Sequence, residues 1–345
     1  MNAPDSKPHL LTVSPSPHMH SPRTTSIVML DVIIALVPLL IWACYVFGMR
    51  ALTVTVITVG SCVLFELLYC LIMKKPITVY DLSAVVTGLL LAYNLPVTIP
   101  LWMPVLGAFF SVVIVKMLFG GIGKNIVNPA LAGRAFLMAS FASAMTVKTL
   151  SARLGLFGSV TDEMILSGAT PLKAVLQNTG ETTFDFETVK SAFIGYESGV
   201  IGEVSGLLIV LGLVYLLIRK VITWHIPVAY IGTVALFAYL LPPSGFARFD
   251  IYYTLTQVCS GGLLLGAVFM ATDYVTCPIT KKGRLIFGVG CGLLTVLIRY
   301  FAGNEGVSYA ILTMNLLTFY IDKITVPRPY GIIKEKKKAS KEAAK

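Results

Sequence analysis

The chain has 345 residues, of which 56% are hydrophobic and only 13% are charged. Soluble domains carry about 25% charged residues, so this composition excludes an ordinary water-exposed globular protein. A net charge of +10 would suggest nucleic acid as a partner for a soluble protein, but here the basic residues lie between apolar runs and at the C-terminus. That distribution is typical of the cytoplasmic loops of membrane proteins, so we expect contact with lipid and no nucleic-acid partner.

Residues 1–25 are rich in Pro, Ser and His and lack an apolar core, so they are predicted to be a disordered cytoplasmic tail rather than a signal peptide. The His18-x-His20 pair is too weak a pattern to predict a metal site. The cysteines include no C-x-x-C pair, and we expect no iron–sulfur cluster bound by this chain alone. Residues 323–345 form a second, basic tail.

Between the tails, apolar runs of membrane-crossing length follow one another. A helix needs about 20 apolar residues to span the hydrocarbon core, or fewer where it is broken and buried in protein. With this criterion we predict ten spans, at Ser26–Phe47, Ala51–Met73, Leu82–Leu95, Val97–Leu118, Ile126–Met145, Gly199–Ile218, Trp224–Leu241, Tyr252–Ala271, Leu285–Ala302 and Val307–Ile321.

The loop charges predict the orientation of these spans. Lysine and arginine concentrate in every second loop, and such loops are normally cytoplasmic. Both termini are therefore expected in the cytoplasm, and residues 146–198 are expected on the opposite side of the membrane. The loops assigned to the cytoplasm contain Lys74, Lys75, Lys124, Arg219, Lys220, Lys281, Lys282 and Arg284.

Residues 26–145 and 199–322 echo each other. Gly88-Leu-Leu-Leu91 lies in the short third span and Gly262-Leu-Leu-Leu265 in the eighth, and polar residues that interrupt a helix follow each of them. Because each half has five spans, the second half would enter the membrane inverted. The predicted fold is an all-α integral membrane protein of two inverted five-helix repeats, with some helices short or broken. Chance similarity between apolar runs is the alternative explanation.

The extracytoplasmic stretch contains Ser167-Gly168-Ala169-Thr170-Pro171. Threonine followed by proline is a common helix start, with Thr170 as the N-cap and Pro171 at the first helical position. A helix N-terminus also offers free N–H groups and a positive dipole end, which suit a phosphate. The residues alone leave both interpretations open.

Ser167-Gly168-Ala169-Thr170 resembles the flavinylation motif of the D subunit of the Rnf complexes. The B subunit of the related sodium-pumping NADH:quinone oxidoreductase shares this motif. Four further stretches resemble the same family in the same order, so the similarity covers about residues 25–331. These stretches are Gly120–Asn125 followed by Asn128–Gly133, Met270–Thr276 followed by Gly283-Arg284, Glu305–Ala310 and Val326–Gly331.

This resemblance implies a membrane flavoprotein that is one component of a translocase, not catalytic alone, in the bacterial inner membrane. FMN would be esterified through its phosphate to Thr170, within the motif that also contains Ser167, Gly168 and Ala169. The complex would move electrons between ferredoxin and NAD and couple this to Na⁺ or H⁺ transport. The expected partners are the A, B, C, E and G subunits of Rnf, above all the flavin-bearing G subunit. Riboflavin is an additional, non-covalent candidate within the bundle. The fold would be that of urea and ammonium transporters.

Three further residues are candidates for the flavin environment. Asn128 belongs to one of the family-like stretches, and Glu203, at the outer start of the sixth span, would face the flavin loop. Arg134, within the fifth span, would either pair with a carboxylate or face a flavin phosphate or ring.

Three acidic residues in or beside the spans are candidates for an ion path, because ionisable groups within a membrane are commonly functional. They are Asp31, Glu66 and Asp273. For the first two, snorkelling or a hydrogen bond between helices is the alternative, and Asp273 would otherwise cap an interrupted helix.

Two other functions remain open. A solute channel or transporter could share the inverted-repeat fold, but it has no need of a Ser-Gly-Ala-Thr stretch in its outer loop. The B subunit of the quinone-reducing relative is expected to carry a longer N-terminal region than the 25 residues found here.

Overall fold

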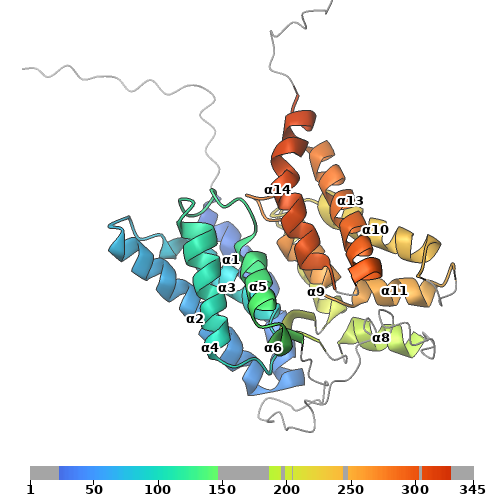
Figure 1. The fold of residues 1–345 in the computed structure, drawn as a ribbon, viewed down its shortest axis with the longest axis horizontal. Helices are drawn as coiled ribbons and strands as arrows, with labels where there is room; N and C mark the ends of the chain where they lie inside the picture. Colours follow the sequence, from blue (N-terminus) through green and yellow to red (C-terminus); the bar gives the residue numbers. More distant parts are fainter. Residues whose placement is uncertain are drawn as a thin grey trace, which may run out of the picture.

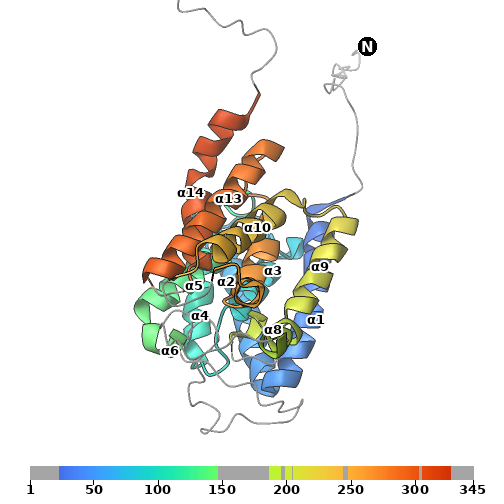
Figure 2. The same cartoon turned by 90° about the vertical axis from the view of Figure 1, so that its right-hand side faces the viewer.

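The computed structural model is helical in all its regular elements within the part of the chain that it describes (Figures 1 and 2). The stretch from Ser167 to Thr170 and residues 328–345 of the basic C-terminal tail lie outside that part, whereas the first residues of the predicted tail, up to Thr325, continue the last helix. The described residues are 23–146, 186–195, 199–203, 205–243, 248–302 and 305–327.

The first half is a run of helices of unequal length. α4 continues directly into the π-helical segment η2, and a 3-10 turn, η1, precedes α3. The elements are α1 (Thr25–Phe47), α2 (Met49–Ile72), η1 (Val79–Asp81), α3 (Ser83–Tyr93), α4 (Trp102–Phe109), η2 (Phe110–Met117), α5 (Pro129–Ser140) and α6 (Ala142–Thr146).

The second half follows the amphipathic helix α8 (Phe186–Ile194). Its fourth main helix, α13, continues into the π-helical segment η6, just as α4 continues into η2 in the first half. The elements are η4 (Ile201–Glu203), α9 (Gly206–Ile218), α10 (His225–Leu240), α11 (Ile251–Cys259), α12 (Leu263–Leu265), η5 (Gly266–Met270), α13 (Lys281–Leu297), η6 (Ile298–Ala302) and α14 (Val307–Thr325).

Several helices have the length and composition of membrane spans. Among the described residues, three are long and apolar enough to cross a membrane, at Thr25–Phe47, Met49–Ile72 and Lys281–Phe301. A fourth candidate is the pair Ile251–Cys259 and Leu263–Met270, which is bent by 61°. Shorter apolar helices make up the rest of the bundle, so the structure fits an integral membrane protein.

Each predicted span overlaps a helix, but some boundaries differ from the prediction. The sixth begins at Gly206 rather than Gly199, because the Ser205 hydroxyl caps it by accepting a hydrogen bond from the Leu208 N–H group. The eighth is broken between α11 and α12. Gly261 and Gly262 there have φ values of 71° and 66°, in the left-handed region that glycine enters without strain.

The two halves have similar internal packing and meet along several elements. α2 packs against α3 and α4, and α10 packs against α11 and α13. Between the halves, α1 packs on α9 and α5 on α14, as the two views show (Figures 1 and 2). The buried core runs through both halves and includes Leu36, Leu91 and Phe287, whereas Ile41 and Leu71 are more than half exposed on the outside. Such apolar exposure is expected where lipid is the solvent.

Candidate functional site

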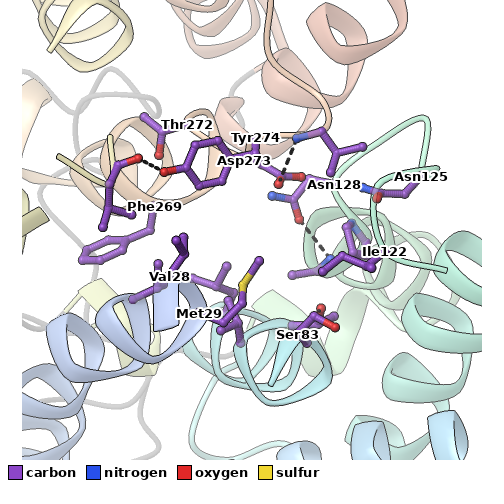
Figure 3. Close-up of a pocket in the computed structure, with 18 of the residues that line it drawn as sticks. Val28, Met29, Ser83, Ile122, Asn125, Asn128, Phe269, Thr272, Asp273 and Tyr274 are labelled. Atoms are coloured by element: carbon purple, nitrogen blue, oxygen red, sulfur yellow. Dashed lines mark hydrogen bonds between the residues drawn. The ribbon is translucent and has the colours of Figure 1, made fainter. Parts of the chain in front are cut away.

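A cavity of about 100 Å³ lies where the two halves meet. α1 and α3 contribute one wall, and the end of α9, η5 and the segment before α5 contribute the others (Figure 3). Much of this surface is apolar, including Val28, Met29, Leu90 and Phe269. The cavity is therefore a mostly apolar slot between elements that are far apart in the sequence.

One edge of the cavity is polar, and Asn128 holds it together. The Asn128 carboxamide oxygen accepts hydrogen bonds from the N–H groups of Ala130 at 3.0 Å and Leu131 at 3.4 Å, which makes it the N-cap of α5. Its amide nitrogen donates to the Met270 carbonyl at 3.2 Å. Asn128 thus ties the start of α5 in the first half to the end of the broken span in the second.

Asp273 lies on the same edge, in the turn that follows η5 (Figure 3). Its carboxylate accepts hydrogen bonds from the Val275 N–H group at 3.4 Å and the Thr276 hydroxyl at 3.2 Å. The neighbouring Tyr274 hydroxyl donates to the Val221 carbonyl at the end of α9. Asp273 therefore shapes the turn at the end of an interrupted helix, and it also lines the cavity.

The carboxylate of Glu66 forms a buried ion pair with Lys116, with 2.8 Å between Nζ and Oε2. The side chains are 0% and 4% exposed, respectively. Lys116 also donates to the Ser83 hydroxyl at 2.6 Å, and the Thr78 hydroxyl donates to Glu66 Oε1 at 2.6 Å. Lys116 also lines the cavity, so its positive charge lies at the cavity wall beside α3.

Asp31 is engaged at the junction of α1 and α9. It pairs with Arg219 at 3.1 Å and accepts a hydrogen bond from the Tyr215 hydroxyl at 3.1 Å. The Arg219 side chain is 47% exposed, so this pair is screened far more than the one at Glu66. One alternative for Asp31 was a hydrogen bond between helices, and the structure shows such a bond between α1 and α9.

Arg134 joins α5 to the start of α14. It pairs with Glu305 at 2.5 Å and donates to the Ser308 hydroxyl at 2.7 Å and to the Asn94 side-chain oxygen at 3.1 Å. Of the two interpretations for this residue, the structure shows the pairing with a carboxylate. Its second predicted role, toward a flavin, would involve residues outside the described ranges.

Glu203 ends η4, whose turn is wedged between the two short helices α3 and α12. A Cβ atom at the adjacent Gly202 would lie 2.6 Å from the Tyr93 Cβ atom and 2.8 Å from Leu265 Cδ2, so glycine is required there. The Glu203 carboxylate lies beside Gly262, at the break of the eighth span. Thr170, Ser167, Gly168 and Ala169 lie outside the described residues, so their distance from Glu203 is not defined.

Sequence reasoning missed the partners of these candidates. Lys116 is the clearest omission, because a lysine within the apolar run 97–118 meets the same criterion that selected Glu66. Glu305 and Asn94 stand in loop-like positions, and nothing local in the sequence indicates that Arg134 reaches both. Their proximity depends on how the two halves pack.

Cys277, which lies between η5 and α13, is not a reactive thiol. It is buried, and burial raises its pKa to about 11. Because the thiolate is the nucleophilic form, this cysteine stays protonated and inert near neutral pH.

The fold and the cavity together define a helical membrane protein with a polar-edged cavity between two packed halves. The chain belongs to the NQR2, RnfD, RnfE family, whose model matches residues 12–331.

Curated relatives match over nearly their whole length. The chain is 45% identical to the D subunit of the Na⁺-translocating ferredoxin:NAD⁺ oxidoreductase complex of Acetobacterium woodii, over 95% of this chain and 98% of that protein. It is 40% identical to the D subunit of the proton-translocating ferredoxin:NAD⁺ oxidoreductase complex of Clostridium ljungdahlii, over 94% and 97%. It is also 38% identical to the D subunit of an ion-translocating oxidoreductase complex of Stutzerimonas stutzeri, over 88% and 91%.

Proposed function

We propose that this chain is the membrane-embedded D subunit of an ion-translocating ferredoxin:NAD⁺ oxidoreductase complex. The observation that carries this assignment is the 45% identity to the D subunit of such a complex, across 98% of that relative's length. Relatives with sodium-translocating and proton-translocating names are similarly close, so the coupling ion is either Na⁺ or H⁺. The proposed partners are the other Rnf subunits, with the flavin-bearing G subunit nearest to the outer loop.

Within this function we propose that Thr170 carries FMN through a phosphoester. The support is the stretch from Ser167 to Thr170, which resembles the flavinylation motif of the family. When bound, a flavin accepts one or two electrons and so links one-electron to two-electron carriers. The role of this chain is to hold it at the extracytoplasmic side of the bundle.

Fluorescence of the denatured protein tests this assignment. The chain is purified with its complex from the native host, run on a denaturing gel and viewed under ultraviolet light. We expect a fluorescent wild-type band, a dark Thr170→Val band and a fluorescent Thr179→Val band, because Thr179→Val removes a hydroxyl from the same loop outside the motif. A dark wild-type band, or no FMN-sized mass increment on the peptide 167–173, would refute covalent flavin.

The cavity between the halves is our candidate for the non-covalent riboflavin. Its apolar walls suit the faces of an isoalloxazine ring, and Asn125, Asn128 and Asp273 supply amide and carboxyl groups at one edge. Ligand sites of this kind are concave, mostly apolar and furnished with a few polar groups. Acid extraction of the purified complex should release riboflavin, and Phe269→Ala should reduce the amount released while the Thr170-linked flavin is retained.

The packing supports ten spans in two inverted repeats. In each half the second helix packs on the third and fourth, and the fourth ends in a π-helical segment, η2 or η6. Each of these two segments carries a buried cation: Lys116 reaches Ser83 at the start of α3, and Arg299 reaches Ser260 at the break between α11 and α12. Because the second half is inverted in this arrangement, the two cations would lie at opposite ends of the membrane.

For ion transport we retain Glu66 and Asp273 as the foremost candidates, because Asp273 lines the cavity and Glu66 pairs with Lys116, which also lines it. Asp31 lies in a partly exposed pair beside α9. In the purified complex, replacing a residue on the ion path should reduce ion transport more than ferredoxin oxidation, whereas a residue needed only for folding should reduce both equally.

A further inference from the structure

A second cavity, of about 130 Å³, lies where α9 leads into α10 and where η5 leads into α13. Lys220, Thr223 and Arg284 line it together with apolar side chains such as Ile226. It shares four lining residues with the cavity described above, Val221, Ile222, Thr272 and Tyr274.

The second cavity is positively charged. Two cations line it, and no acidic side chain does. Neither Lys220 nor Arg284 forms an ion pair within the part of the chain that the structure describes.

The nearest acids are occupied elsewhere. Asp322 accepts a hydrogen bond from the Ile279 N–H group at 3.0 Å, Asp31 pairs with Arg219, and Asp273 accepts bonds within its own turn. None of these three carboxylates lines the second cavity, and none forms an ion pair with Lys220 or Arg284 among the described residues.

Arg284 is held in a fixed position. Its Nε group donates to the Pro278 carbonyl at 3.0 Å, and its Nη1 group donates to the Thr223 hydroxyl at 3.0 Å. Its Nη2 group makes no hydrogen bond to any described residue. A guanidinium that is anchored on two sides and open on the third is preorganised for an oxyanion.

The start of α10 adds a second contribution. α10 begins at His225, and its N-cap residue, Trp224, provides no side-chain cap. The first N–H groups of a helix lack partners within the helix, and its dipole places positive charge at that end. Because Thr223 and Ile226 both line the cavity, this helix end lies at its wall.

We propose that this second cavity binds a phosphate group, held by Arg284, Lys220 and the start of α10. Both cations belong to segments that the loop charges predict to be cytoplasmic: Lys220 follows α9, and Arg284 lies near the start of α13. The phosphate would belong either to an anionic phospholipid of the cytoplasmic leaflet or to a soluble phosphate compound. The site is independent of the flavin on Thr170.

The test uses the full chain in its purified complex, with short-chain phosphatidylglycerol, short-chain phosphatidylcholine and inorganic phosphate as separate probes. Saturable stabilisation against thermal unfolding measures binding. We expect Lys220→Gln and Arg284→Gln each to weaken binding about tenfold, as befits one charge-assisted hydrogen bond. Lys281→Gln removes the same charge from the first turn of α13, outside the cavity, and should bind like the wild type.

The probes separate the two sources. Stabilisation by phosphatidylglycerol but not by inorganic phosphate identifies a lipid headgroup, and stabilisation by both identifies a soluble phosphate site. Equal binding by all three variants, or no saturable effect of either phosphate probe, overturns the proposal. The Lys220 side chain is exposed and makes no hydrogen bond to a described residue, so Lys220→Gln decides the matter if Arg284→Gln fails to fold. Thr170→Val should bind normally, which separates this result from any failure of the flavin assignment.

Discussion

At the scale of single residues, the pair of Glu66 and Lys116 is the most consequential polar contact in the first half. Both side chains are removed from solvent, and taking two charges out of water costs several kcal/mol per ion. The additional hydrogen bonds from Thr78 to Glu66 and from Lys116 to Ser83 offset part of that cost. Removing one partner would leave the other as an uncompensated buried charge.

Glu66→Gln and Lys116→Met should therefore each lower the free energy of unfolding by about 3–5 kcal/mol, and the double variant should recover much of that loss. Unfolding in mixed micelles of increasing dodecyl sulfate content measures these values. Lys74→Met removes an exposed lysine nearby and should change the free energy by less than about 0.5 kcal/mol. Additive losses in the double variant would show that the two side chains are not coupled.

At the scale of elements, the break in the eighth span is stabilised from another helix. Arg299, on η6, is fully buried and donates to the carbonyls of Gln257 at 2.7 Å and Ser260 at 3.0 Å, which belong to the end of α11. It also donates to the Gln257 side-chain oxygen at 3.0 Å and the Glu305 carbonyl at 3.2 Å. The last carbonyls of a helix lack partners within the helix, and one guanidinium satisfies two of them here.

Arg299→Lys keeps the charge, but a single ammonium cannot reach acceptors spread around a planar fork. We expect amide hydrogen exchange in residues 251–270 to accelerate by at least about tenfold, because each lost bond to a charged donor stabilises by roughly 1.5–3 kcal/mol. Arg50→Lys, where the arginine makes one bond to the Ile99 carbonyl, is the matched control. Unchanged exchange at 251–270 would mean that α11 and α12 hold the break without Arg299.

At the scale of the whole molecule, the halves are joined by packing and by a few polar ties. α1 packs on α9, and Arg134 bonds to Glu305 and Ser308 across the boundary between α5 and α14. The cavity lies between the same two halves. Any shift of one half against the other would therefore change the shape of the cavity.

The proposed topology makes a specific prediction for exposed positions. Met49 is at the start of the second span and Lys282 is at the start of the ninth, so seven spans, an odd number, lie between these two positions in the proposed topology. A membrane-impermeant maleimide added to intact cells should label Met49→Cys but not Lys282→Cys, and inside-out vesicles should give the reverse. The unsubstituted chain provides the background from native cysteines. Labelling of both positions from one side would contradict the ten-span count.

Much of the helical pattern was predictable from the sequence. The apolar runs of α1 and α2 have membrane-crossing length, and the fifth helix begins at Pro129, capped by Asn128, rather than at the predicted Ile126. The break at Gly261 and Gly262 was not predicted: the sequence indicated an interruption only in the polar residues that follow Leu265, whereas the chain also breaks at these two glycines, which have positive φ values. Lys116 was overlooked although its signal, a charge in an apolar run, was present.

The sequence by itself determined the class of protein, the helical segments and the resemblance that carries the functional proposal, because hydropathy, capping residues and short motifs are local properties of the chain. Only the tertiary structure decided which charges meet. Glu66 lies 50 residues from Lys116 and Arg134 lies 171 from Glu305, so these pairs and both cavities exist only once distant helices are packed side by side. Burial then decides their chemistry, because a charge removed from water must find its partner within the fold.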